Sequence, residues 1–184
     1  MSAKNILFST NHQKIISLLA ENSDKSFTEK EIVKDTGVSK TGVNAVLKEL
    51  EGSGLVLREK RGRMSFWSVD DSIPLIQELK KTQNLSTLFP LVQKLKPVAK
   101  RIILYGSTAT GTDTSESDID LFVLTENKNE VFKEIRAFKT HREIKPVVQT
   151  TLEYATSRKK DKVFYEQVAK GIILFEKEAD EQRL

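Results

Sequence analysis

The sequence contains no cysteine, which excludes disulfide bonds and metal sites built from thiolates. It has no apolar run close to the ~20 residues that span a bilayer, so we expect no contact with a membrane. Its first residues lack the basic start, apolar middle and small-residue cleavage site of a signal peptide. These absences favour an intracellular protein, and we expect it to be cytoplasmic.

The composition is that of a folded globular protein. Hydrophobic residues make up 38% of the 184-residue chain and charged residues 30%, which is atypical of disordered chains. A chain of this length forms one medium domain or two small ones. The net charge of +4 permits binding of nucleic acid or nucleotides but does not require it. Any affinity for DNA must therefore depend on where the basic residues lie.

Hydrophobic periodicity divides the chain into three parts. We expect a domain of helices and a hairpin, a helical linker and an α/β (α+β) domain, over residues 1–71, 72–98 and 99–184. In the linker, Pro74, Pro90 and Pro97 are expected to limit the lengths of the helices. In the last part we expect strands over 101–105, 118–124, 143–149 and 172–175, and helices over 131–138 and 161–170.

Capping residues mark the start and end of one N-terminal helix. Thr28 and Glu31 form a capping box, in which each side chain can satisfy a free backbone N–H, and Gly37 is expected to end the helix. A helix over 11–21 precedes it, and a third helix is expected to begin near Ser39. That third helix has apolar residues at spacing 0, 3, 4, 7, which are Val43, Val46, Leu47 and Leu50.

Two short β-type runs, 55–60 and 64–69, follow the third helix and indicate a hairpin around Arg61-Gly62-Arg63. This order of helices and hairpin is that of a winged helix-turn-helix. The stretch 27–56 resembles the winged-helix regulators of the MarR and ArsR families. The resemblance implies DNA binding, transcription regulation and a homodimer that matches two DNA half-sites. The alternative is a winged helix that serves protein contact.

The residues expected to face DNA lie on the third helix and on the hairpin, or wing. The helix would enter the major groove, where Lys binds phosphate or guanine and Asn pairs with adenine. The wing would lie along the phosphate backbone. The candidate DNA-binding residues are Lys40, Thr41, Asn44 and Lys48 on the helix and Arg61 and Arg63 on the wing.

The most informative stretch is LYGSTATGTDTSESDIDLFVL, residues 104–124. A strand is expected to end at Tyr105, and Gly106 then lets the backbone turn sharply and come close to a ligand. Ser107 offers a hydroxyl and a backbone N–H at the start of a short helix, a position that favours phosphate. Gly111 adds a second flexible point, so these two glycines and Ser107 are candidate nucleotide-binding residues.

Two aspartates follow, and the alternation of a strand points Asp118 and Asp120 to the same face. Adjacent carboxylates repel each other unless a cation lies between them, and Mg²⁺ is usually held by one or two carboxylates plus substrate phosphates. Two such ions can activate an attacking oxygen and stabilise a leaving pyrophosphate. A phosphate-binding turn beside an Asp-x-Asp strand therefore favours nucleotidyl transfer.

This stretch resembles the signature of the minimal nucleotidyltransferases in the DNA polymerase beta superfamily, with Gly106, Ser107, Asp118 and Asp120 as the matching residues. The resemblance implies a small nucleotidyltransferase-fold domain with a mixed sheet. It also implies transfer from an NTP, with ATP the expected donor, in a reaction that requires Mg²⁺ or Mn²⁺ in its place. Asp118 and Asp120 would bind the metal, and Gly106 and Ser107 would hold the triphosphate.

The same resemblance implies a third carboxylate on a neighbouring strand, as metal ligand or base. The best candidate is Glu143, at the start of an expected strand, and Glu153 is the fallback. The sequence departs from many relatives at Thr110, where they carry an arginine. Either another cation, such as Lys100 or Arg101, compensates for that arginine, or the activity is reduced.

Three functions remain open on the sequence. The first is nucleotidyl transfer to a protein hydroxyl, a tRNA end or a small molecule. The second is a DNA-binding transcription regulator whose second domain is an inactive nucleotide sensor. The third is one component of a toxin–antitoxin pair. Pyrophosphate release that Asp120→Ala abolishes would separate the first function from the second.

Overall fold

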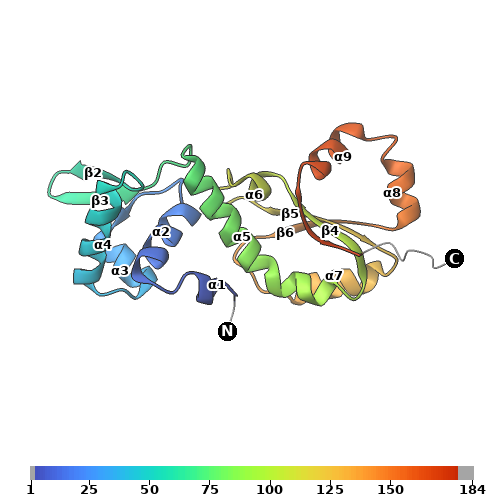
Figure 1. The fold of residues 1–184 in the computed structure, drawn as a ribbon, viewed down its shortest axis with the longest axis horizontal. Coiled ribbons are helices and arrows are strands. Elements are labelled where there is room, and N and C mark those ends of the chain that lie inside the picture. The colour runs from blue at the N-terminus through green and yellow to red at the C-terminus, as the bar shows by residue number, and fades with distance from the viewer. Residues whose placement is uncertain (1–2, 178–184) are drawn as a thin grey trace. The chain divides into compact units, whose positions relative to one another are not determined.

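The computed structural model describes residues 3–177 and divides the chain into two compact units (Figure 1). The N-terminal unit comprises the chain through Thr87 together with Gly111–Glu116. The C-terminal unit comprises Leu88–Thr110 and the chain from Ser117 onward. None of the helices described is both long and apolar enough to cross a membrane.

The helices that precede the hairpin of the N-terminal unit are α1 (Ala3–Leu7), α2 (Asn11–Glu21), α3 (Glu29–Thr36) and α4 (Lys40–Gly52). The predicted capping box of α3 is present, because Thr28 Oγ1 accepts from Glu31 N at 3.4 Å and the Glu31 carboxylate accepts from Thr28 N at 2.7 Å. Gly37 follows the helix with a φ of +68°, which a side chain would disfavour. The predicted start and end of α3 are therefore confirmed.

A small antiparallel sheet in the order β1-β3-β2 accompanies these helices. Its strands are β1 (Phe27–Thr28), β2 (Leu57–Arg61) and β3 (Met64–Ser68). The apolar stripe predicted on α4 is buried, together with Trp67 of β3, which is 2% exposed. The elements thus follow the order predicted for a winged helix-turn-helix, with β2 and β3 in the place of the wing.

Helix α5 (Pro74–Leu95) corrects the expectation that each proline would limit a helix. Pro74 begins the helix, where a missing N–H has no consequence, whereas Pro90 lies inside it and leaves the carbonyl of Ser86 without its helical donor. An internal proline costs about 3 kcal/mol. Burial of a large apolar side chain contributes about 1.5–3 kcal/mol. The helix therefore continues because its apolar stripe is buried, at Leu88, Leu91, Val92 and Leu95.

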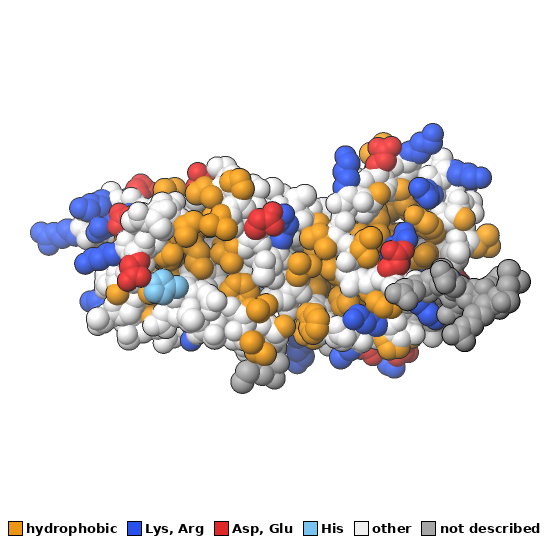
Figure 2. Space-filling view, viewed as in Figure 1, with side chains coloured by type: hydrophobic (Ala, Val, Ile, Leu, Met, Phe, Trp, Pro, Cys, Tyr) orange, Lys and Arg blue, Asp and Glu red, His pale blue; other side chains and the backbone are white. Residues whose placement is uncertain are grey.

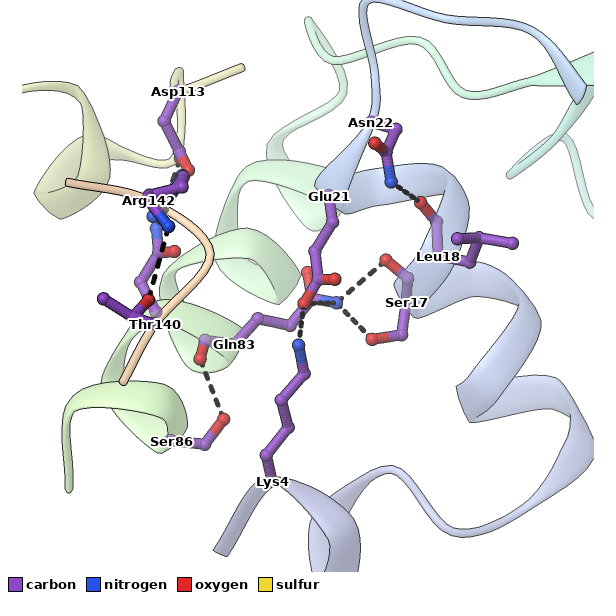
Figure 3. Close-up of polar contacts among 11 residues, drawn as sticks. Lys4, Ser17, Leu18, Glu21, Asn22, Gln83, Ser86, Asp113, Thr140 and Arg142 are labelled. Carbon is purple, nitrogen blue, oxygen red and sulfur yellow. Dashed lines mark hydrogen bonds and ion pairs between the residues drawn. The ribbon is translucent and has the colours of Figure 1, made fainter. Parts of the chain in front are cut away.

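Polar contacts hold the first half of α5 against the other helices of the N-terminal unit (Figure 3). Gln83 is buried, and its amide donates to the Ser17 carbonyl of α2 at 3.0 Å and to Glu21 Oε1 at 3.4 Å. Lys4 of α1 pairs with the same Glu21 carboxylate. These contacts satisfy the buried amide nitrogen of Gln83, which would otherwise destabilise the fold.

The C-terminal unit is built on a sheet in the order β6-β5-β4-β7. Its strands are β4 (Ala99–Tyr105), β5 (Ile119–Thr125), β6 (Ile144–Gln149) and β7 (Ile172–Glu176). β5 and β6 run parallel, whereas the pairs β4–β5 and β4–β7 are antiparallel. The sheet is therefore mixed, and the predicted α/β (α+β) fold class is confirmed.

Helices cover both faces of this sheet, with α7 on one side and α8 and α9 on the other (Figure 1). The helices are α6 (Ser107–Thr110), α7 (Lys128–Ala137), α8 (Thr151–Ser157) and α9 (Lys162–Ala169). Phe122 of β5 faces Tyr154 of α8 and Tyr165 of α9, with ring centroids 5.7 and 6.3 Å away. Helix α8 was not predicted, although its capping box, Thr150 and Glu153, could have indicated it.

Candidate active site

The first half of the site is the turn that joins β4 to α6. Tyr105 ends β4, and Gly106 adopts a φ of +73°, so the chain reverses into α6 at Ser107. The Thr108 hydroxyl donates to the Tyr105 carbonyl at 3.2 Å and fixes this turn. A Cβ atom on Gly106 would collide with Asp120 Oδ2. Glycine is therefore required both by the backbone conformation and by the carboxylate behind it.

The second half of the site lies at the start of β5, where Asp118 precedes the strand and Asp120 is its second residue. Asp120 pairs in register with Tyr105, which brings it beside the Gly106 turn. Both aspartates are partly exposed, whereas Ile119 between them is 2% exposed. The predicted alternation is thus present, with the carboxylates on one face and the apolar side chain in the core.

The two aspartates place two negative charges close together on this face of the sheet. Burial raises the pKa of Asp120, the charge of Asp118 raises it further, and Lys145 opposes both effects. Burial and the charge of Asp120 raise the pKa of Tyr105 to about 12. An additional cation at this point would stabilise the ionised aspartates.

Lys145 is a site residue that the sequence reasoning missed. It pairs in parallel register with Asp120, and its Nζ lies 2.5 Å from Asp118 Oδ2. The hydrogen bond to Asp118 and its charge are the main causes that raise the pKa of Lys145, which therefore stays charged. Only the parallel register of β6 against β5 indicates this position, and the sequence predicts a neighbouring strand there but not its register.

The two candidates for a third carboxylate lie in different surroundings. Glu143 precedes β6, is exposed, and its carbonyl accepts from Ile119 N at 2.8 Å. Glu153 accepts from Thr150 N at 2.8 Å and pairs with Lys128 at 2.7 Å. Among residues 3–177, no group of three or more His, Cys, Asp or Glu residues is arranged to hold a metal ion. The role of Glu143 therefore stays a prediction.

Gly111 lies in the N-terminal unit, although it belongs to the motif by sequence. It is buried with a φ of +75°, and a Cβ atom there would lie 2.9 Å from Gln77 Cα and closer still to the Gln77 carbonyl. Close packing against the backbone of Gln77 therefore explains why a glycine is needed at this position. Its role in nucleotide binding stays a prediction.

The rest of the segment 111–116 is held by polar contacts within the same unit. The amide of Asn84 donates to the Asp113 carboxylate at 3.2 Å, and the buried Lys80 ammonium donates to the Asp113 carbonyl. Ser115 donates to the Asp24 carboxylate through its backbone N–H at 3.3 Å and its hydroxyl at 3.1 Å. The segment between the two halves of the site is thus anchored in the N-terminal unit.

Two of the candidate DNA-binding residues, Lys40 and Arg63, line a groove in the N-terminal unit. The groove measures about 570 Å³ and is lined by Thr28, Glu29, Lys30, Val33, Lys40, Arg58, Arg63, Met64 and Ser65. Four cations and one acid line it, and we call it the basic groove. Figure 2 shows Lys and Arg side chains grouped over β2 and β3. Lys30 was not among the predicted residues.

The predicted residues differ in their exposure and in the contacts that they already make. Lys40, Thr41 and Lys48 are exposed on α4, and the Asn44 amide donates to the Lys40 carbonyl at 3.2 Å. Arg61 makes a bidentate pair with Glu59, at 2.9 and 2.6 Å. Its charge is therefore already partly neutralised.

Two solved structures that are distantly similar to this chain illustrate the likeness. A protein proposed to be a nucleotidyltransferase, from Sulfolobus solfataricus, is 15% identical over 55% of this chain and 87% of its own, with a TM-score of 0.39. TrmBL2, an archaeal chromatin protein with a novel mode of DNA binding, is 13% identical over 84% of this chain and 70% of its own, with a TM-score of 0.31. Both TM-scores lie below 0.5, so neither structure bears on the function of this chain. No curated protein matches the chain significantly.

The family described as "Polymerase beta, Nucleotidyltransferase" matches residues 87–180, just over half of the chain. The matched part contains the β4–α6 turn and the start of β5, where Gly106, Ser107, Asp118 and Asp120 lie. The chain therefore belongs to the polymerase beta nucleotidyltransferase family.

Proposed function

We propose that this nucleotidyltransferase moves a nucleotidyl group from an NTP, with ATP the expected donor, to an acceptor hydroxyl in a Mg²⁺-dependent reaction. The observation that carries the proposal is the contact between the two halves of the motif: the Gly106 turn lies directly against the Asp120 carboxylate. A protein hydroxyl, a tRNA end and a small molecule all suit such chemistry as acceptors.

The donor set fits a divalent metal. Asp118 and Asp120 present carboxylate oxygens on one partly exposed face, and the charge of Asp118 helps to raise the pKa of Asp120. Mg²⁺, or Mn²⁺ in its place, takes such ligands together with substrate phosphates. When bound, the metal would neutralise charge that develops on the phosphates.

The chain's own residues would divide the remaining tasks. Gly106 lets the backbone make the turn, and Ser107 offers its hydroxyl and backbone N–H to a phosphate there. Asp118 and Asp120 would hold the metal. Glu143, which precedes the neighbouring strand, would accept the proton of the attacking hydroxyl. Thr110 supplies no charge, so any cation for the phosphates must come from another residue.

The first test is the double variant Asp118→Ala/Asp120→Ala. We expect it to abolish Mg²⁺-dependent ATP binding, because the phosphates lose their metal bridge, and to abolish pyrophosphate release. Calorimetric titration with ATP, with and without Mg²⁺, measures binding, and a pyrophosphate assay with candidate acceptors measures turnover. Glu166→Ala, which removes an exposed carboxylate of α9, is the control and should behave as wild type.

The outcomes of this test separate the candidate functions. Metal-dependent binding with turnover supports the enzyme, and binding without turnover supports a nucleotide sensor in a transcription regulator. Unchanged ATP affinity in the double variant would contradict the site itself. A toxin–antitoxin role would appear as a protein partner that co-purifies with the chain.

The basic groove favours a second function, DNA binding by the N-terminal unit. Its cations come from three elements: Lys30 from α3, Lys40 from α4, and Arg58 and Arg63 from the hairpin region. Cations that converge on one groove suit the phosphates of a DNA strand, with the exposed residues of α4 beside it for the bases. Such a contact would bring the enzyme to DNA or let it regulate transcription.

Salt dependence of DNA binding tests this function. Each phosphate contact contributes about 0.9 to the slope of log K against log[salt]. We expect Lys40→Ala and Arg63→Ala each to reduce the slope by about one. Arg61→Ala should reduce it less, because Glu59 already pairs with Arg61. Lys14→Ala, on the exposed side of α2, is the control, and equal slopes in all variants would contradict the groove as the DNA contact.

A further inference from the structure

We propose that Lys145 is a resident cation of the Asp118–Asp120 pair, which releases Asp118 when a divalent metal binds and then pairs with a phosphate of the nucleotide. The inference rests on the proposed function, because it concerns the metal and nucleotide of the same site. It makes Lys145 both a competitor of the metal and a binding residue for the substrate.

The position of Lys145 follows from the parallel pairing of β6 with β5. Asp120 and Lys145 are register partners, so their side chains leave the same face of the sheet. From there the Lys145 ammonium reaches across to Asp118, at 2.5 Å from Oδ2. One lysine thus lies beside both carboxylates that the metal would use.

The exposure of Lys145 allows it to move. Its side chain is 57% exposed, whereas that of Asp118 is 34% exposed. An exposed lysine stem is flexible, and an ion pair at a surface contributes little to stability. The pair with Asp118 is therefore weak enough to be exchanged for a stronger ligand.

The charges of Lys145 and of the metal ion determine which of the two cations stays bound to the aspartates. Without a metal, Lys145 offsets one of the two negative charges, and the other stays uncompensated on this face. A divalent ion at Asp118 Oδ2, the oxygen that the ammonium contacts, would repel the ammonium and displace it from that oxygen. The released ammonium would still lie opposite Asp120, which is itself beside the Gly106 turn where the phosphates would be held. It would then supply the positive charge that Thr110 lacks.

The variant Lys145→Met tests this dual role through opposite effects on two affinities. With Mn²⁺ alone, calorimetry should show about five- to tenfold tighter binding, because the competing cation is gone. With a non-hydrolysable ATP analogue and saturating Mg²⁺, nucleotide affinity should fall about five- to tenfold, because a phosphate contact is lost. Lys145→Arg keeps the charge and should resemble wild type in both measurements.

The control is Lys128→Met, which removes another lysine paired with a carboxylate of the same unit, at 2.7 Å from Glu153. It should change neither affinity.

Weakening of both affinities in Lys145→Met would mean that Lys145 only supports the fold, and Mn²⁺ affinity equal to wild type would overturn the competition. Wild-type protein that binds Mn²⁺ but no nucleotide would contradict the proposed function, while the Mn²⁺ comparison would still decide the role of Lys145. Absence of Mn²⁺ binding in both proteins would overturn the competition, while Mg²⁺-dependent ATP binding would still decide the proposed function.

Discussion

Gly106→Ala is expected to lower Mg²⁺-dependent ATP affinity by about 100-fold or more while leaving the protein folded. The new Cβ would collide with Asp120 Oδ2, which is the end of a side chain and can rotate away. Rotation relieves the collision but moves the carboxylate out of the position that would bind the metal. The fold should tolerate the change, whereas the site should not.

The positive φ of Gly106 adds backbone strain to the effect of the collision, and a matched control variant separates the two. An alanine at a φ of +73° costs about 1–2 kcal/mol. Gly54 has a φ of +76°, and no atom lies within 4 Å of the position that a Cβ would occupy there, so Gly54→Ala carries the same strain without a collision. ATP affinity measured by calorimetry should therefore be unchanged in Gly54→Ala. Wild-type affinity in Gly106→Ala would mean that the place of Asp120 does not govern binding.

Local signals in the sequence were enough to predict this part of the site. The turn at Gly106 and the face shared by Asp118 and Asp120 depend on residues close together in the chain. The capping box at Thr28 and the apolar stripe of α4 were predicted for the same reason, since each depends on neighbours within one helix.

What the sequence did not reveal depends on contacts between distant segments. Lys145 joins the site only because β6 pairs in parallel with β5, and no local pattern specifies that register. Pro90 lies inside α5 because tertiary burial outweighs a local preference. Gly111 was interpreted from its place in the motif, yet its surroundings come from α5, which is distant in the chain.

Gly111→Ala is expected to destabilise the N-terminal unit, although Gly111 lies within the segment matched by the nucleotidyltransferase family. The new Cβ would collide with backbone atoms of Gln77, which the hydrogen bonds of α5 hold in place. Strain from the φ of +75° costs about 1–2 kcal/mol, and overpacking against fixed atoms adds about 1–3 kcal/mol. The expected loss of stability is therefore about 3 kcal/mol.

Fluorescence of Trp67 reports the unfolding of the N-terminal unit, where the loss of stability is expected. Trp67 is the only tryptophan of the chain, and it is buried in the core of the N-terminal unit. A loss of about 3 kcal/mol should lower the urea midpoint of its transition by roughly 1–2 M. Gly54→Ala has the same strain in the same unit and should lower the midpoint much less. Gly106→Ala should leave the Trp67 transition unchanged.

The contrast between the two motif glycines tests how the segment 111–116 is held. If the anchorage by Lys80 and Asn84 governs its position, Gly111→Ala should also weaken ATP binding, because the segment connects α6 to Asp118. The weaker ATP binding should appear at urea concentrations below those that unfold the core around Trp67, since the segment is released before the core unfolds. A Trp67 midpoint equal to wild type in Gly111→Ala would show that the N-terminal unit gains no stability from this segment.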